Sequence, residues 1–375
     1  MRVLDWVIAI ATLASMGCGD DGSQGGGGAG GSPISGGAGG LGTGGDGGAS
    51  VESRVLVSVA LHLEPSTAYS QCAVAGYYGT RDRLVEFVKA TSALGATLNI
   101  QSDNTFLEGI RDCEATATHT NTDGMSLGDW LAAQSGVEFD AHKEGGNELN
   151  GTGTGPDDFL YADVHALLDA DVPNPSDVVG GLIWQDANQL ARLEDPAGAT
   201  GVDPASPPWF PAILSLAVGT NHHLGNFDDD DFSSGVWRPK GANADFTTDD
   251  PAKLPYVGPG LQHTDWGNTC PYGFHDARDY IPVILTMVDE GSAAPGLYTA
   301  TLALPEDTLK LGDPAGRWAH AIEIIEGVNE LAAADARIQW ANYSTVVETW
   351  QTEFASSPTR VALTDIPAER WTCAP

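Results

Sequence analysis

The sequence predicts an α/β fold, a distorted (β/α)7–8 TIM-like barrel with long loops at the carboxyl ends of the strands. Amphipathic helical segments that end near a glycine alternate with short β-rich segments, an order typical of parallel sheets. The β-rich segments are almost continuously apolar, as expected of strands that are covered on both faces. Their number favours a barrel. A doubly wound open sheet is the alternative, although no glycine fingerprint follows the first strand.

The first residues are typical of a secretory signal, with Arg2 before an apolar run from Val7 to Ala14. The run is too short to span a bilayer, and the alternative is a short buried helix. The sequence SMGC resembles the lipobox of bacterial lipoproteins, except that Ser15 stands where leucine is usual. This resemblance implies a signal peptide over residues 1–17 and a lipidated Cys18. It also implies a bacterial cell-envelope location, with a lipid anchor in the outer membrane or at the cell surface.

Residues 18–50 are predicted to be the lipidated cysteine and a disordered linker, because 17 of the 32 residues from Gly19 to Ser50 are glycine. Such a segment cannot bury enough apolar surface to become ordered. A phosphate-binding glycine loop is excluded, since no strand precedes these glycines and no Lys-Ser/Thr pair follows them. Residues 51–375 are long enough for one large domain or two ordinary ones, and we expect one barrel domain.

The chain is strongly acidic, with 51 acidic against 17 basic residues and a formal net charge of −34. No basic surface is available for nucleic acid, so that class of partner is excluded. Binding to anionic lipid through the domain surface is also disfavoured. We therefore expect contact with the membrane through the lipid anchor only. A monomer is also expected.

Four cysteines follow Cys18, and none of them forms a Cys-x-x-Cys pair, which argues against a thiolate zinc site. In an exported protein an even number of cysteines predicts two disulfides. Three pairings are possible. We favour Cys72 with Cys113 and Cys270 with Cys373, because these pairs close the shorter loops.

The helices and strands are predicted from hydrophobic periodicity and from stop signals. Thr80 can cap the first helix and Gly95 can end it, while Ser126 can cap the next. Asp195 to Asp279 has few clear elements and is expected to form large loops around a binding face. Strands are predicted at 55–63, 96–101, 137–141, 178–184, 213–219, 281–288, 297–304 and 337–341, and helices at 80–94, 126–135, 157–171, 317–335 and 346–354.

Polar side chains collect where the predicted strands end, which is where barrels carry their functional sites. The first strand ends in His62 and Glu64, which are two residues apart and therefore share a face. The third strand ends in Asp140, His142 and Glu144. The same trend holds at other strand ends, with Gln101, Asp103, Trp184, Gln185, Asp186, Asn221, His222, His223, Trp340, Asn342 and Tyr343.

Imidazoles and carboxylates in one place suit zinc or a similar divalent metal. His62, Glu64 and His142 are the predicted ligands, and zinc is the predicted metal. Glu64 or Asp140 could serve as a general base. The alternatives are a hydrogen-bonded histidine at position 62 and an ordinary loop carboxylate at position 64.

The run WRPKG, from Trp237 to Gly241, is the most distinctive short motif. Arg238 offers a planar fork that can hold a carboxylate, and Trp237 a flat face for a sugar. A surface turn is the alternative. Trp184, Trp237 and Trp340 are the predicted sugar-binding residues, although tryptophans equally fit a core.

Taken together, LHLEP, FDAHKEGG and WRPKG resemble, in this order, motifs of the polysaccharide deacetylase and glycoside hydrolase barrel superfamily. The resemblance covers most of Val55 to Phe354, and RIQWANYSTVVETW is similar to the last strand and helix of that family. It implies a metal site at the ends of strands one and three. The sequence departs from the family pattern where His62-Leu63-Glu64 replaces paired aspartates. It departs again at Gly146, where a second histidine is usual, so either Glu144 or His165 substitutes for that histidine or metal binding is lost.

This resemblance predicts a secreted, lipid-anchored carbohydrate-active hydrolase that removes acetyl groups from a polysaccharide with a divalent metal. In such an enzyme, Arg238 would orient a carboxylate at the active site. A glycosidase that uses two carboxylates, such as Glu64 and Asp186, is one alternative. A carbohydrate-binding surface lipoprotein without catalytic activity, on a decayed barrel, is the other, and the missing second histidine favours it.

Overall fold

The computed structural model describes residues 51–64, 66, 68–142, 161–180, 209–215, 233–241, 245–261, 273–310, 312 and 316–373. The chain divides into two compact units, Met1–Ala49 and Ser50–Pro375, and every described residue belongs to the second unit. None of the helices in these ranges combines the length and the apolar character that crossing a membrane requires.

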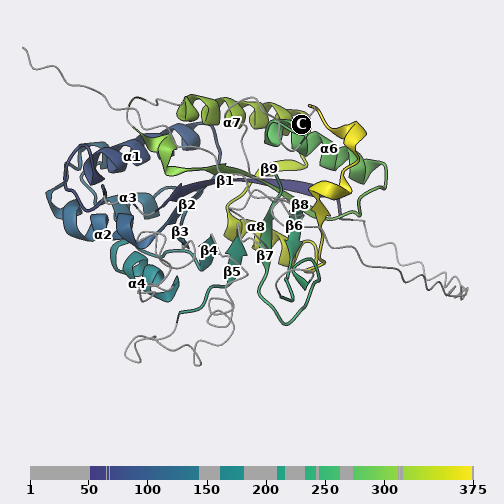
Figure 1. The fold of residues 1–375 in the computed structure, drawn as a ribbon, viewed down its shortest axis with the longest axis horizontal. Coiled ribbons are helices and arrows are strands. Elements are labelled where there is room, and N and C mark those ends of the chain that lie inside the picture. The colour runs from purple at the N-terminus through teal and green to yellow at the C-terminus, as the bar shows by residue number, and fades with distance from the viewer. Residues whose placement is uncertain are drawn as a thin grey trace, which may run out of the picture. The chain divides into compact units, whose positions relative to one another are not determined.

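The described residues of the second unit form one mixed sheet with helices packed around it (Figure 1). The strands follow the order β10-β6-β7-β5-β4-β3-β2-β1-β8, and β9 pairs with the start of β1. All pairs are parallel except β6 with β7 and β10 with β6. The strands are β1 (Arg54–Leu63), β2 (Leu98–Ser102), β3 (Val137–His142), β4 (Val178–Gly180), β5 (Ile213–Ser215), β6 (Ser233–Trp237), β7 (Tyr256–Pro259), β8 (Leu297–Leu304), β9 (Ile338–Trp340) and β10 (Val361–Ala362).

The sheet curls until β6 meets β8. The Ser234 hydroxyl donates to the Thr299 carbonyl at 2.7 Å, and the Thr299 amide donates back to that hydroxyl at 2.9 Å. The Gly235 amide donates to Thr299 Oγ1 at 2.8 Å. Side chains rather than a continuous ladder thus close the sheet, which confirms the predicted distorted α/β barrel.

Alternate residues of β1 face two different apolar layers, as the period of a strand requires. Val55, Val57, Val59, Leu61 and Leu63 pack outward in the larger cluster, which includes residues of α1 and α7.

The helices are α1 (Tyr77–Ala93), α2 (Asn104–Cys113), α3 (Leu127–Ala132), α4 (Tyr161–Asp171), α6 (Ala277–Asp289), α7 (Arg317–Ala334) and α8 (Tyr343–Thr352), with short 3-10 turns η1 (Glu114–Thr116), η2 (Thr120–Thr122), η6 (Glu306–Leu309), η7 (Leu363–Asp365) and η8 (Ala368–Arg370).

Helix α8 fills the inner side of the sheet. Its residues Val346, Val347 and Trp350 pack in one cluster with Leu56 and Ala60, the inward residues of β1. In Figure 1, α7 lies on the outer side of β1 and α8 on the opposite side. Near the end of α8, Glu353 pairs with Arg54 at 2.7 Å, so this end of the helix lies at the amino end of β1.

The prediction of a strand at 281–288 was wrong, because these residues belong to α6. Its sequence, IPVILTMV, is a short apolar run rich in β-branched residues, which periodicity alone cannot assign. The Asp276 side chain caps the helix by accepting a hydrogen bond from the Arg278 amide. The helix therefore begins at Ala277, four residues before the predicted strand at 281–288. Pro282 lies within α6.

Other boundaries were partly right. Ser126 caps α3, as predicted, by accepting the Asp129 amide. Thr80 is not a cap, since α1 already begins at Tyr77. The middle of the chain was expected to be irregular, yet it contains β6 and β7. The predicted strands at 178–184 and 213–219 are observed as β4 and β5, and their remaining residues lie outside the described ranges.

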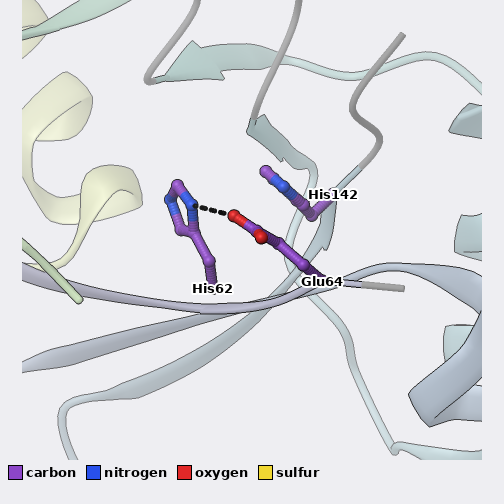
Figure 2. Close-up of side chains that lie close together, drawn as sticks. All are labelled: His62, Glu64 and His142. Atoms are coloured by element: carbon purple, nitrogen blue, oxygen red, sulfur yellow. Dashed lines mark ion pairs between the residues drawn. The ribbon is translucent and has the colours of Figure 1, made fainter. Parts of the chain in front are cut away.

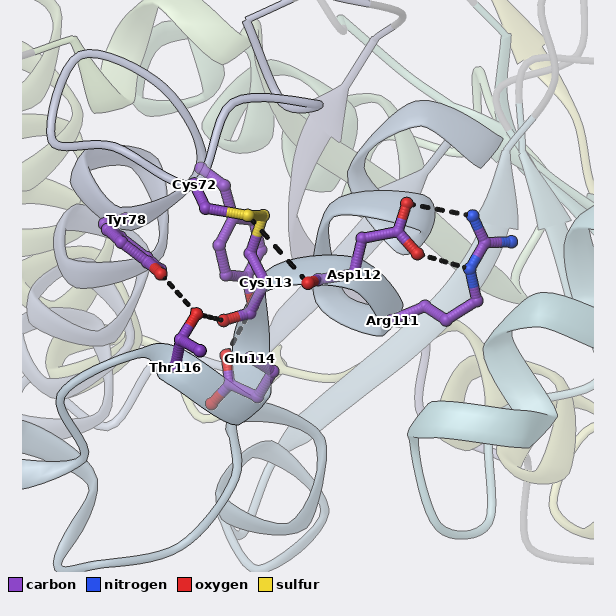
Figure 3. The surroundings of a disulfide bond; sticks show 8 residues. Cys72, Tyr78, Arg111, Asp112, Cys113, Glu114 and Thr116 are labelled. Atoms are coloured by element: carbon purple, nitrogen blue, oxygen red, sulfur yellow. Dashed lines mark hydrogen bonds and ion pairs between the residues drawn. A yellow bond between two sulfur atoms is a disulfide. The ribbon is translucent and has the colours of Figure 1, made fainter.

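The predicted disulfide between Cys72 and Cys113 is confirmed (Figure 3), with the Cα atoms 5.2 Å apart. It joins the segment after β1 to the end of α2. Cys373 is also disulfide-bonded. Its predicted partner Cys270 lies outside the described residues, so that pairing stays a prediction.

Candidate metal centre

His62, Glu64 and His142 converge at the carboxyl ends of β1 and β3 (Figure 2). One potential ligand atom of each residue lies within 4.8 Å of those of the other two. His62 Nδ1 is 3.9 Å from Glu64 Oε1. The two imidazole rings have centroids 4.6 Å apart and planes tilted by 37°. His142 is fully buried, whereas the Glu64 side chain is 37% exposed, so the cluster lies at the border between the interior and solvent.

The strand register explains this convergence. His62 is level with Gln101 of β2, and Gln101 is level with Asp140 of β3. His142 comes two residues after Asp140 on β3, so it lies on the same inward face and nearer the carboxyl end of the strand. Two strands on either side of a third are about 10 Å apart. The inward curl of the sheet therefore brings the two imidazoles much closer than their backbones.

Gly180 provides the space beneath the cluster. It pairs with His142, and a Cβ atom on it would lie 2.1 Å from Gln101 Oε1. The Gln101 side chain instead crosses this space, and its amide nitrogen donates to Ser215 Oγ on β5 at 3.0 Å. A buried glutamine thus forms the floor of the site, and only glycine at position 180 leaves room for it.

These residues fit a divalent metal. Two imidazoles and a carboxylate are typical ligands of zinc. At a bond length of about 2.1 Å, two zinc ligands are at most about 4.2 Å apart, so a small side-chain adjustment would suffice. Among the described residues, the buried Nε2 of His62 has no hydrogen-bond partner. An unsatisfied buried ring nitrogen costs free energy, which a metal or a bound water would recover.

Asp140 does not fit the role of a general base. It is fully buried, and Asn99 Nδ2 donates to it at 2.9 Å while also donating to Glu138 at 2.9 Å. Burial, followed by the charge of Glu138, raises the pKa of Asp140 to about 8. Burial raises the pKa of Glu138 as well. Asp140 is therefore enclosed in a polar layer below the histidines, where burial and the charge of Glu138 disfavour its ionised form.

Glu306 is a neighbour of the cluster that the sequence analysis missed. It follows β8 and begins η6, and the Tyr69 hydroxyl donates to its Oε2 at 3.0 Å. Burial raises the pKa of Glu306, and the charge of nearby Glu64 raises it further. A signal was present: LALPE at 302–306 repeats the pattern of LHLEP at 61–65, an apolar strand that ends in proline and glutamate.

Arg238 does not join this site. It follows β6, which runs antiparallel to β7, so Trp237 pairs with Tyr256 at the amino end of β7. Its guanidinium donates to Asp249 through Nε at 3.1 Å and through Nη2 at 2.8 Å, and it lies over the Trp350 ring. Arg238 thus lies near the amino end of the barrel, opposite to the histidines. The expectation that it orients substrate there does not fit this geometry.

Two predicted sugar-binding tryptophans are also placed elsewhere. Trp237 is 1% exposed and donates to the Phe246 carbonyl at 2.7 Å, so it is a core residue. Trp340 lies on β9 beside Val57 and donates to Asn329 Oδ1 of α7 at 2.7 Å. Other predicted residues lie outside the described ranges, namely Cys18, Glu144, Gly146, Trp184, Asp186 and Cys270.

Comparisons with known proteins found no match to a family model and none to a curated protein. Several solved structures are similar at low identity. The chain aligns over 80% of its length with 90% of Puue allantoinase, at 14% identity and a TM-score of 0.43. It also aligns over 80% of its length with 91% of a probable polysaccharide deacetylase of Pseudomonas aeruginosa, at 14% identity and a TM-score of 0.41.

A 4-alpha-glucanotransferase of Thermococcus litoralis is similar over 82% of this chain, at 10% identity and a TM-score of 0.43. This chain covers only 40% of that protein. We take no activity from any of these proteins and infer function from the side chains of this chain.

Proposed function

We propose that the protein is a metal-dependent hydrolase that removes acyl groups from a glycan. The observation that carries the proposal is the meeting of His62, Glu64 and His142 at one border between the interior and solvent. These three residues would hold a divalent metal, with zinc suited to the ligand set. When bound, such a metal polarises a carbonyl and lowers the pKa of a water.

The residues of the chain have separate tasks in this proposal. His142 is buried and fixed on β3, so it sets the position of the centre. Glu64 is the most exposed of the three, and it would have two tasks: one carboxylate oxygen would hold the metal, and the second would accept a proton from an attacking water. The Gln101 floor closes the site from below. Asp140 supports β3 from the polar layer and takes no part in proton transfer.

The glycan substrate rests on the resemblance of LHLEP and FDAHKEGG to deacetylase motifs, since both occur at the strand ends that form the cluster. WRPKG lends no support, because Arg238 lies at the other end of the barrel. The acidic surface of the chain favours neutral or cationic substrates over anionic ones.

One observation favours a second candidate, a glycosidase. Glu64 and Glu306 follow β1 and β8, which are neighbouring parallel strands, and the charge of Glu64 raises the pKa of Glu306. Two carboxyl groups with different pKa values are the basis of glycoside hydrolysis. Glu306 would be the acid and Glu64 the nucleophile or base.

Product analysis separates the two candidates. Purified full-length protein loaded with zinc is incubated with acetylated xylan and with chitotetraose, and both acetate and new reducing ends are measured. We expect acetate, and Glu64→Gln should reduce its release by about 100-fold or more, as expected for loss of a general base. Glu330→Gln, an exposed glutamate on α7, is the matched control. New reducing ends without acetate would replace the deacylase with the glycosidase, and neither product would contradict both.

We further propose that the enzyme works outside the cytoplasm as a lipoprotein, on the strength of the lipobox-like SMGC sequence. Metabolic labelling with a radioactive fatty acid tests this in a bacterial host. Wild-type protein should be labelled and Cys18→Ala unlabelled. Equal labelling of both would contradict the lipid anchor at this residue.

A further inference from the structure

A pocket lies beside the candidate metal centre, and neither the metal proposal nor the deacylation chemistry accounts for it. We call it the Tyr69–Glu306 pocket. Its volume is about 320 Å³, which is at the small end of the range of roughly 300–1,000 Å³ for ligand sites. It is lined by Ser66, Ala68, Tyr69, Val74, Ala75, Gly76, Gly79, Thr80, Glu306, Leu309 and Lys310.

The pocket adjoins the metal centre through both of its walls. Ser66, on one wall, is two residues after Glu64. Glu306, on the other wall, comes two residues after Leu304, which pairs with Leu61 of β1, so the chain leaves β8 beside the end of β1 that carries Glu64. A molecule in the pocket would therefore lie next to the group that reacts at His62, Glu64 and His142.

The wall formed by residues 68–80 is held in place before any ligand binds. The disulfide from Cys72 to Cys113 ties it to α2. The Tyr77 amide donates to the Gln71 carbonyl at 2.9 Å, and a Cβ atom on Gly76 would lie 2.5 Å from the Ala68 carbonyl oxygen. A preformed wall reduces the entropy that ligand binding would cost.

The polar groups of the pocket favour a ligand that donates hydrogen bonds. Tyr69 donates to Glu306 Oε2, and a carboxylate has lone pairs for about four hydrogen bonds, so Glu306 retains acceptor capacity. Lys310 is the one cation among the described lining residues, and it pairs with Asp307. The carboxylates of Glu306 and Asp307 outnumber the single cation at this pocket, and this excess of negative charge disfavours an anionic ligand.

The rim adds an apolar contact. Val74 is 68% exposed, which is the highest value among the three exposed large hydrophobic side chains in the described part of the chain. A sugar ring combines hydroxyl donors with an apolar C–H face, and both would be matched here. A single exposed valine is common on protein surfaces, so the informative feature is that Val74 lines the same pocket as Glu306.

We infer that the Tyr69–Glu306 pocket is a subsite for one neutral sugar unit of the glycan, next to the unit that reacts at the metal centre, and that it excludes uronic acids. This inference rests on the proposed function, because it takes a glycan as the substrate. It assigns Glu306 and Val74 to substrate selection.

Binding of three tetrasaccharides tests the inference by calorimetry on full-length protein: neutral chitotetraose and xylotetraose, and anionic tetragalacturonate. We expect at least one neutral ligand to bind, and tetragalacturonate to bind at least tenfold more weakly. Glu306→Gln should weaken neutral binding by about fivefold, the difference between a charged and a neutral hydrogen bond, and should reduce the discrimination against tetragalacturonate. Val74→Asp should weaken neutral binding as well.

Matched controls are Val51→Asp, at a valine that is 47% exposed outside the pocket, and Glu330→Gln on α7. Both should leave the dissociation constants unchanged. The inference is overturned if Glu306→Gln and Val74→Asp leave neutral binding within twofold of wild type. It is also overturned if tetragalacturonate binds as tightly as the neutral ligands, or if none of the three binds.

Metal content measured on the same samples keeps this result separate from the proposed function. Pocket variants should hold as much zinc as wild type. Pocket-dependent sugar binding in a wild type that takes up no zinc would support the subsite and contradict the metal centre. Zinc uptake without pocket-dependent binding would contradict the subsite alone.

Discussion

Glu114 is a buried carboxylate that holds together several elements near the disulfide. Arg81 of α1 donates to it through Nε at 3.0 Å and through Nη2 at 3.0 Å. The Tyr77 hydroxyl donates at 2.6 Å, and the Leu127 amide at the start of α3 at 2.7 Å. Burial alone would raise the pKa of Glu114, but the hydrogen bonds from Arg81 and Tyr77 outweigh it and lower the pKa.

The first prediction concerns this residue. Glu114→Gln leaves the buried Arg81 with the exposed Asp82 as its remaining carboxylate partner and should lower the free energy of unfolding by about 3 kcal/mol at pH 7. Because the folded pKa of Glu114 is lowered, its contribution is fully present above the unfolded pKa of about 4.3 and is lost progressively as the pH falls from there through the folded pKa. Urea unfolding at pH 7 and pH 3.5 measures this.

The gap between wild type and Glu114→Gln should therefore shrink at pH 3.5. Glu86→Gln removes an exposed pair with Arg83 and serves as the control, with an expected change below about 0.5 kcal/mol. An equal gap at both pH values would show that the charge of Glu114 does not stabilise the fold.

The second prediction concerns the floor of the metal centre. Gly180→Ala places a methyl group where Gln101 lies, so Gln101 must move and lose its hydrogen bond to Ser215. We expect a loss of about 1–3 kcal/mol in the free energy of unfolding, the cost of an unsatisfied buried amide. Gly241→Ala is the matched control, since its Cβ would lie an ordinary 3.5 Å from Asp245. Equal stability of the two variants would contradict the proposed floor.

The sequence predicted individual site residues unevenly. His62, Glu64 and His142 were predictable because strand period and strand ends are local features. The raised pKa of Asp140 was not, because it depends on burial and on Glu138 beside it in the folded chain. The pairing of Glu306 with Tyr69 joins residues 237 positions apart, which no local pattern contains.

At the scale of elements, the disulfide between α2 and the segment after β1 supports both stability and the pocket wall (Figure 3). The two cysteines are separated by 41 residues, and opening a loop of this length costs about 4 kcal/mol in the entropic account. The third prediction is that Cys72→Ser with Cys113→Ser lowers the free energy of unfolding by about this amount and weakens binding in the Tyr69–Glu306 pocket. Unchanged sugar binding would show that the wall keeps its shape without the disulfide.

Strand direction explains why one motif was misplaced. WRPKG follows an apolar strand as LHLEP does, and the sequence does not show that β6 runs antiparallel to its neighbour. The direction of a strand depends on pairing with distant residues, here Ser234 with Pro259. The strand predicted at 281–288 was wrong for a similar reason, because its apolar residues fit a strand or a helix equally well and only tertiary packing decides between them.

At the scale of the whole molecule, alternation of helices and apolar strands was sufficient to predict the α/β barrel. The way in which the barrel closes could not be predicted, because it depends on Ser234 and Thr299, two small polar residues that contact each other across β6 and β8. The plugging of the interior by α8 also follows from tertiary packing, since the apolar residues of this helix fit an outer position equally well.

The central claim is that His62, Glu64 and His142 form a metal centre, and metal content tests it most directly. Full-length wild type, a His62→Ala, His142→Ala double variant and the control His320→Ala on α7 are loaded with zinc, desalted and analysed by elemental mass spectrometry. Circular dichroism checks that all three are folded. We predict about one zinc per chain in wild type and control, and none in the double variant. Zinc absent from wild type, or retained by the folded double variant, would contradict the claim.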